Sequence, residues 1–307
     1  MNAPTIHLVY ASGSRTTAPQ SIGTALKERP PDGFNVVQHD WAARYAIRPN
    51  EGDILVGHAH PDSRTIFRTS MEASWRRRVL LMPFNADPLQ VAWLEPLVRR
   101  VDVFVAISGP GWRTALPFTP FGHWEPKIRW VDTAISADDF PFIHQGRDAV
   151  RRTILYVGGS HPAKNLGHLE RIAEELRSYQ FLSVGAGLSL RNFRNLGPLP
   201  NSSAEFYSAV RQSDFLISVG YADANPTTVL EGMAMGLIPL TSPSSGWTED
   251  QGVNHISGSS SPAAAEQIEA YRKRLCGNAA ATRSDNRRRV EQFFNWNNFS
   301  TTVWNHV

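Results

Sequence analysis

Two carboxylates, a Pro-Thr-Thr turn and a helix of small residues occur together in residues 221–239, YADANPTTVLEGMAMGLIP. Asp223 falls in a loop, and Glu231 follows after seven intervening residues, about a turn and a half into a helix that Pro226 and Thr227 can start. The first turn of such a helix presents free N–H groups and the positive end of the helix dipole to the loop. A diphosphate is the natural occupant of this loop, because its negative charge is complementary to both.

Length and composition indicate a globular protein with two domains. The 307 residues suffice for two domains of roughly 150 residues each. Hydrophobic residues make up 41% and charged residues 19% of the chain, which excludes global disorder, and the net charge of +3 does not require a polyanionic partner. Cys276 is the sole cysteine, which excludes an intramolecular disulfide and a multi-cysteine metal cluster, so we expect a cytoplasmic location.

The sequence shows neither a targeting segment nor a membrane span. The first residues, MNAPTIHLVYASGSR, place no basic stretch before their short apolar run, so they predict a first strand rather than a signal peptide. The longest apolar runs, near residues 79–84 and 103–107, fall far short of the roughly 20 residues that a spanning helix needs.

Short apolar strands alternate with helical stretches in both halves of the chain. Strands are predicted at 6–10, 35–38, 53–57, 79–82, 103–108, 153–157, 181–184, 215–219 and 238–241. Helices are expected at 166–178, at 203–212, through Glu231, and across 263–307 with an interruption near Gly277. This rhythm predicts an α/β fold with two Rossmann-like halves, each a parallel doubly wound sheet. We place the linker near 141–151 and expect ligands in a cleft at the carboxyl ends of the strands.

Three separated segments match, in order, motifs of retaining GT-B glycosyltransferases, particularly the large family four. The segments are ILYVGGSHPAKNLGHLERIAEEL at 154–176, LGPLPNSSAEFYSAVRQSDFLISVG at 196–220, and the opening segment at 221–239. The chain resembles a short member of this family. The resemblance implies GT-B architecture, with an acceptor-side domain at 1–145 and a nucleotide-sugar-binding domain at 146–285 whose parallel sheets face each other across a cleft. Residues 286–307 resemble the closing helix that packs back on the N-terminal domain.

In the first matching segment, Lys164 takes the place of the family's phosphate-binding lysine. The resemblance implies that its ammonium neutralises the departing diphosphate, which gains negative charge as the glycosidic bond breaks. The family's neighbouring arginine is missing, since Gly159 and Ser160 stand where it would be.

The other two segments supply the remaining donor contacts that the resemblance implies. Glu231 would accept hydrogen bonds from both ribose hydroxyls, and Asp223, in place of the family's first glutamate, would hold hydroxyls of the donor sugar. The nucleobase would lie near Leu196, and a turn after the first strand would meet the phosphates. The expected donor-binding residues are Gly13, Ser14, Gly158, Gly159, Lys164, Leu196, Asp223, Asn225, Pro226, Thr227, Thr228 and Glu231.

The segment GHAHPD, which contains His58, His60 and Asp62, resembles the family's cleft-facing histidine segment. By this resemblance His58 and His60 orient the acceptor or the transferring sugar, and His60 joins Lys164 and Asp223 as an expected catalytic residue. A histidine pair at this spacing also suggests a metal ion, but a strand places the two rings on one face without a third ligand. GT-B enzymes generally use protein cations instead, so we expect no metal and no cofactor beyond the nucleotide-sugar co-substrate.

The function expected from the resemblance is transfer of a sugar from a nucleotide-diphosphate donor to a hydroxyl, with retention and without a metal. Glycan, lipid-linked or polysaccharide acceptors are expected, and a nucleic acid acceptor is the minority interpretation because the net charge is modest. Basic-aromatic patches at 75–78 and 99–100 could form a surface that faces a polyanion or the inner membrane face, but solvated helix ends are the favoured interpretation. Two other functions stay open: a nucleotide-sugar epimerase on the same fold, and a non-catalytic nucleotide-sugar or glycan-binding module.

Overall fold

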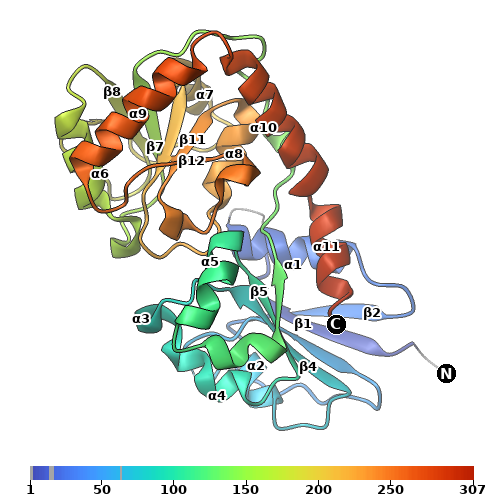
Figure 1. Cartoon of the computed structure of the whole chain (residues 1–307). Coiled ribbons are helices and arrows are strands. Elements are labelled where there is room, and N and C mark those ends of the chain that lie inside the picture. The colour runs from blue at the N-terminus through green and yellow to red at the C-terminus, as the bar shows by residue number, and fades with distance from the viewer. Residues whose placement is uncertain (1–2, 14–16, 63) are drawn as a thin grey trace. The chain divides into compact units, whose positions relative to one another are not determined.

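The chain folds into two compact units, seen in a computed structural model that describes residues 3–13, 17–62 and 64–307. The first unit comprises Met1–Ser108, Arg113–Asp132 and Trp296–Val307, and the second comprises Gly109–Trp112 and Thr133–Asn295 (Figure 1). Residues 141–151, where the sequence suggested a linker, therefore lie within the second unit.

The first unit contains a parallel six-stranded sheet in the order β2-β1-β3-β4-β5-β6. Its strands are β1 (Thr5–Tyr10), β2 (Asn35–Asp40), β3 (Ile54–Gly57), β4 (Arg77–Pro83), β5 (Val103–Ile107) and β6 (Ile128–Val131). Every residue of the central strands β3 and β5 is buried, as expected for parallel strands covered on both faces. The sequence-based prediction missed β6, because this edge strand is only four residues long and its burial does not alternate: Ile128 and Val131 are buried, whereas Arg129 is exposed and Trp130 is half-buried.

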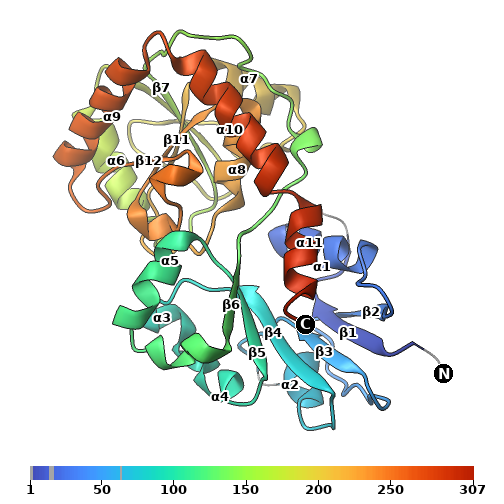
Figure 2. The same ribbon diagram turned by 45° about the vertical axis from the view of Figure 1, so that its right-hand side comes forward.

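The helices of the first unit are α1 (Ala18–Glu28), α2 (Ile66–Ser70), α3 (Pro88–Val91), α4 (Glu95–Val98), the second half of α5 (Pro110–Ala115), and α11 (Trp296–Trp304). Thr17 and Gln20 form a capping box that starts α1. The C-terminal helix α11 packs against α1 (Figure 2) and against β6. The Trp304 indole donates to the Arg29 carbonyl at 2.6 Å, which fixes the end of α11 to the end of α1.

The second unit contains a parallel six-stranded sheet in the order β12-β11-β10-β7-β8-β9. Its strands are β7 (Thr153–Val157), β8 (Gln180–Val184), β9 (Arg194–Asn195), β10 (Phe215–Ser218), β11 (Ile238–Thr241) and β12 (Asn254–His255). The order is that of a Rossmann sheet, in which the chain crosses from the third strand back to the far side of the first. The edge strands β9 and β12 were not predicted, since two residues are too few to produce an alternating pattern.

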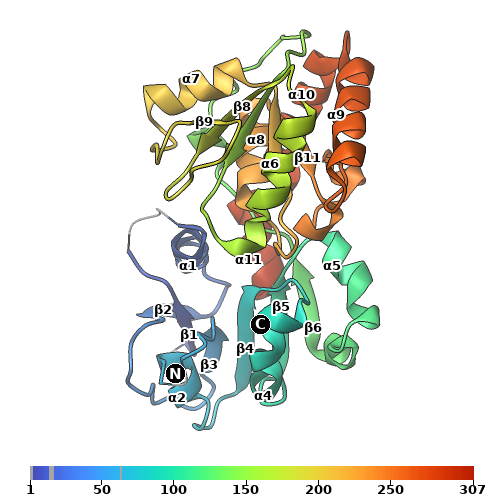
Figure 3. The same cartoon turned by 90° about the vertical axis from the view of Figure 1, so that its left-hand side faces the viewer.

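Alternate residues of the strands pack against helices on the two faces of this sheet (Figure 3). Ile154 and Tyr156 belong to the cluster under α6 (Leu166–Glu175) and α9 (Ser261–Leu275). Leu155 lies in the opposite cluster, under α7 (Ala204–Gln212), α8 (Thr227–Met235) and α10 (Ala279–Phe293). Among the described residues, no helix is both long enough and apolar enough to cross a membrane.

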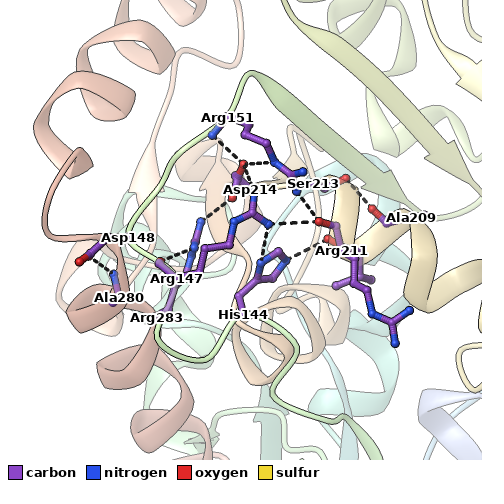
Figure 4. A network of polar contacts seen from close by, with 11 residues as sticks. His144, Arg147, Asp148, Arg151, Ala209, Arg211, Ser213, Asp214, Ala280 and Arg283 are labelled. Carbon is purple, nitrogen blue, oxygen red and sulfur yellow. Dashed lines mark hydrogen bonds and ion pairs between the residues drawn. The ribbon is translucent and has the colours of Figure 1, made fainter.

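A buried ion-pair network anchors the amino end of β10 (Figure 4). Asp214, which is 0% exposed, accepts from Arg283 Nη2 at 2.6 Å, and Arg283 is itself fully buried. The other carboxylate oxygen accepts from the Arg151 backbone N–H at 2.7 Å and from Arg147 at 3.4 Å. Arg147 also contacts the His144 ring at 3.1 Å. One carboxylate thus fastens residues 144–151 and α10 to the central strand of the second unit.

Replacing Arg283 with methionine is expected to lower the free energy of unfolding by about 3 kcal/mol, because a buried carboxylate loses its buried partner. Arg147 and Arg151 still reach Asp214, which keeps the loss at the lower end of the usual range for a broken buried pair. Urea denaturation measures the change. The matched control is Arg288→Met on the same helix, where an exposed pair with Asp285 is worth about 1 kcal/mol at most; equal losses in the two variants would contradict an anchoring role.

Candidate donor site and acceptor-side residues

Each sheet has a topological switch point, where two neighbouring strands connect onward to opposite sides of the sheet. Most of the predicted site residues lie near these two points. In the second unit this point lies between β7 and β10, which pair through Phe215 with Ile154 and Leu216 with Leu155. In the first unit it lies between β1 and β3. Loops that leave the carboxyl ends of such strands diverge and open a crevice for ligands.

The loop after β7 carries Lys164 to the loop after β10. Asn165 adopts a left-handed conformation with φ of 56°, and its side-chain amide donates to the Val219 carbonyl at 3.3 Å and the Gly258 carbonyl at 3.2 Å. Asparagine tolerates this conformation better than most residues. Held in this way, the Lys164 ammonium forms an ion pair with the Asp223 carboxylate. The two residues predicted from separate motifs therefore meet.

The loop that carries Asp223 is fixed by hydrogen bonds on both sides. Ser242 and Ser244 donate their hydroxyls to the Gly220 carbonyl at 2.7 Å and 2.9 Å. The Trp112 indole donates to the Asp223 carbonyl at 2.7 Å. The side chains of Asp223 and Lys164 are 19% and 32% exposed, so both remain accessible to a ligand while their backbones are held.

The helix α8 begins directly after this loop and carries Glu231 in its second turn. Pro226 is the N-cap, in an extended conformation, so Thr227 and Thr228 start the helix. The Val229 N–H donates to the Pro226 carbonyl at 3.2 Å, whereas the N–H groups of the first two helical residues have no acceptor within an α-helix. Glu231 is partly buried. Burial raises the pKa of its carboxyl, and a hydrogen bond from the Thr227 side chain opposes the rise.

Asn225, also expected to bind donor, takes part in a hydrogen bond within the fold. Its side chain is buried, and its Oδ1 accepts from the Thr133 backbone N–H at 2.8 Å. This bond ties the loop between β10 and α8 to the point where the chain enters the second unit. The amide oxygen thus has a structural role.

Gly158 and Gly159 follow β7, and Leu196 follows β9 and pairs with β8. The Gly158 N–H donates to the Val184 carbonyl at 3.0 Å, and the Leu196 N–H donates to the Ser183 carbonyl at 2.9 Å. Gly185 must be glycine, since a Cβ there would lie 1.8 Å from the Gly158 carbonyl oxygen. The backbone of the loop after β7 is therefore held directly against the end of β8.

Tyr156 lies beneath this loop and was not singled out from the sequence. Its hydroxyl donates to the Gly159 carbonyl at 3.0 Å. Burial, and then the negative charge of Asp223, raise the pKa of the Tyr156 hydroxyl, which keeps it a neutral hydrogen-bond donor. As a buried residue in a strand, it gave no signal that distinguished it from the core.

In the first unit, His58 and His60 follow β3 and lie beside Trp41, which follows β2. The His58 ring contacts Trp41 edge to face, with ring centroids 4.7 Å apart, and contacts Tyr10 with centroids 5.6 Å apart. The His60 and Trp41 centroids are 6.2 Å apart. Trp41 was missed by sequence analysis, although its place just after a predicted strand was an available signal.

The remaining expectations concern the turn after β1 and a metal ion. Gly13 is described and exposed, with φ of 109°, whereas Ser14 lies outside the described residues. Across residues 3–13, 17–62 and 64–307, no three or more His, Cys, Asp or Glu side chains form a group that could hold a metal ion.

The free energy of unfolding should decrease as the pH is lowered, because the folded protein holds His58 neutral. Burial, and then the charge of His60, lower the pKa of His58 from 6.5 to about 4. Between these values the unfolded chain binds a proton that the folded chain does not, so unfolding becomes easier as pH falls through 6.5. His144, whose pKa burial also lowers to about 4, contributes in the same direction.

We therefore expect a smaller pH effect in His58→Phe. Between pH 7 and pH 5, its free energy of unfolding, measured by urea denaturation, should decrease less than that of the wild type. The expected difference is roughly 1–2 kcal/mol, and the phenyl ring preserves packing against Trp41 and Tyr10. An identical pH dependence in the two proteins would show that His58 does not titrate as described.

No model of a protein family matches the sequence, and no curated protein matches it. Solved structures resemble it in fold. Sucrose-phosphate synthase from Thermosynechococcus elongatus superposes with a TM-score of 0.71 at 12% identity, over 98% of this chain and 98% of that one. HepE of Anabaena, in complex with UDP and glucose, gives 0.68 at 12% identity over 98% of each chain. A glycosyltransferase from Rickettsia africae ESF-5 gives 0.65 at 12% identity over 99% and 98%. Together with the two six-stranded parallel sheets, these likenesses confirm the predicted GT-B fold with two Rossmann-like units.

Proposed function

We propose that the chain is a glycosyltransferase that moves a sugar from a nucleotide-diphosphate donor to an acceptor hydroxyl. The observation that carries this proposal is the Lys164–Asp223 ion pair, formed at the crevice of the second sheet where α8 begins. A cation, a carboxylate and free helix N–H groups at one point suit a ligand with a diphosphate next to a polyhydroxyl ring. Structural likeness to HepE, which binds UDP and glucose, supports the same donor class.

In this proposal the second unit binds the donor. The N–H groups of Thr227 and Thr228 and the dipole of α8 hold the diphosphate. Glu231 accepts from the ribose hydroxyls, and the base lies against the backbone near Leu196. Gly158 and Gly159 let the backbone approach the donor closely, because neither carries a side chain.

Lys164 and Asp223 then divide the work on the reacting part of the donor. Before a donor binds, the ion pair holds the ammonium in place. A bound donor exchanges this partner: its hydroxyls accept from Lys164 or donate to Asp223, and its phosphate oxygens attract the ammonium. As the bond between the anomeric carbon and the phosphate oxygen breaks, the ammonium neutralises the charge that develops on the leaving diphosphate.

The acceptor is assigned to the first unit, on His58 and His60 with Trp41 beside them. The new bond forms between the acceptor oxygen and the anomeric carbon, and the hydroxyl proton passes to the leaving phosphate oxygen. This route needs no enzymic base and retains the anomeric configuration. It also needs no metal ion, since Lys164 and the α8 dipole supply the positive charge. Glycan, lipid-linked or polysaccharide acceptors fit this assignment.

Incubation with labelled nucleotide sugars, with and without a cell extract, tests the function. Transfer of label to a larger product only when extract is present is the expected result. Formation of an epimer without extract would replace the proposal with an epimerase. Binding of the nucleotide sugar with no chemical change in either condition would replace it with a non-catalytic binding module.

Lys164→Met should lower turnover at least tenfold, equivalent to about 1.4 kcal/mol of activation free energy, because the leaving diphosphate loses its cation. Steady-state kinetics with a saturating donor measures the effect. Lys273→Met is the matched control, since it removes an exposed lysine from α9 of the same unit and should leave turnover unchanged. A loss smaller than tenfold in Lys164→Met would contradict a principal role in stabilising the leaving group.

A further inference from the structure

A polar cavity in the second unit has no part in the proposed transfer. It has a volume of about 410 Å³ and lies where α9 ends and α10 begins, against residues 249–254. This volume is within the range of roughly 300–1,000 Å³ typical of small-molecule sites. Arg283 of α10 pairs with Asp214 at the start of β10, so this end of α10 lies at the amino ends of the strands. Lys164 follows β7, so it lies at the carboxyl ends of the strands, opposite to the cavity.

The floor of the cavity contains a buried amide that lacks a partner. Asn286 is 2% exposed, and within the described part of the chain its Nδ2 has no hydrogen-bond partner. Its Oδ1 lies close against Gly252, where an added Cβ would be only 2.4 Å away. A buried donor without an acceptor costs about 1–3 kcal/mol, so its presence in a cavity indicates a site for a ligand acceptor. Val253 and Leu275 add apolar surface to the same floor.

The rim carries balanced charges that are held in place by neighbouring residues. Arg274 donates to Asn254 Oδ1 at 3.0 Å and lies over the Tyr271 ring at 4.7 Å. Arg289 donates to the Asp250 carbonyl at 2.6 Å. Two carboxylates, those of Glu249 and Asp285, also line the cavity, so the formal charge of its lining residues is zero; Asp285 also pairs with Arg288, which does not line the cavity.

A cavity with several donors, several acceptors and no net charge favours a neutral ligand rich in hydroxyl groups. Each hydroxyl can donate to a carboxylate and accept from a guanidinium or an amide, whereas a phosphate would face two carboxylates at the rim. The apolar floor suits the C–H face of a sugar ring.

We propose that this cavity binds a neutral saccharide unit of a glycan, apart from the site of transfer. The identity of the glycan as acceptor or product rests on the proposed function, whereas binding itself does not. A glycan held in this cavity would remain attached to the protein between successive sugar transfers.

A glycan array that carries neutral and acidic oligosaccharides, probed without any nucleotide, tests the proposal. The wild type is expected to bind neutral glycans. Thr282→Trp, which fills the cavity from its rim, and Asn286→Leu, which removes the buried donor, should each weaken binding at least tenfold. Ser284→Trp is the matched control, because this exposed residue of α10 does not line the cavity and should bind as the wild type does.

Binding to acidic glycans alone, absence of binding to any neutral glycan, or unchanged binding by Thr282→Trp would overturn the proposal. Thr282 is partly exposed, so this variant remains informative where Asn286→Leu fails to fold. Failure of the two proposals can be told apart with Lys164→Met, which should keep its binding in the cavity. If sugar transfer is absent while the cavity variants still lose glycan binding, the transferase proposal alone fails.

Discussion

The buried Asp214 carboxylate is the interaction on which the second unit depends. It stands at the start of β10, whose other end leads into the loop that carries Asp223. Through Arg283 it also fixes α10, which packs against α8 and so supports the helix that carries Glu231. A charge pair that is 0% exposed on both sides is expensive to form. It allows one side chain to fix the positions of β10, of residues 144–151 and of α10.

At the candidate site, individual hydrogen bonds hold the loops that follow the carboxyl ends of the strands. Asn165, Ser242, Ser244 and Trp112 hold backbone carbonyls, and each leaves the Lys164 and Asp223 side chains partly exposed. The loops are thereby positioned before any ligand binds, which limits the entropy lost on binding. The ion pair between Lys164 and Asp223 also holds the two charged groups together at this point.

Much of the fold could be predicted from the sequence, because buried parallel strands leave continuous apolar runs. The predicted 153–157 strand is β7 residue for residue, and α8 begins at Thr227 as its Pro-Thr signal indicated. The edge strands β6, β9 and β12 could not be predicted, since two-residue strands and half-exposed edges carry no periodic pattern. The predicted helix at 166–178 ends earlier, at Glu175, because Leu176 leaves the helical conformation as its C-cap.

The site was predictable only as separate motifs. Sequence placed Lys164, Asp223 and Glu231 near strand ends and helix starts, but the contact of Lys164 with Asp223 depends on a crossover that no local pattern reports. Trp41 and Tyr156 were missed because a single aromatic near a strand is typical of a core. The buried amide of Asn225 shows the reverse case, a residue in a functional motif that the fold uses to hold its own backbone.

The most direct test of the central claim, a nucleotide-diphosphate site between β7 and β10, is a thermal-shift titration with UDP, GDP and ADP. One of these should raise the melting temperature in a saturable way, since a ligand at 100 times its Kd stabilises the folded state by about 2.7 kcal/mol. The same nucleotide should stabilise Glu231→Ala far less, because the ribose loses its carboxylate. Absence of a shift with all three nucleotides, or equal shifts in the wild type and Glu231→Ala, would contradict the assigned site.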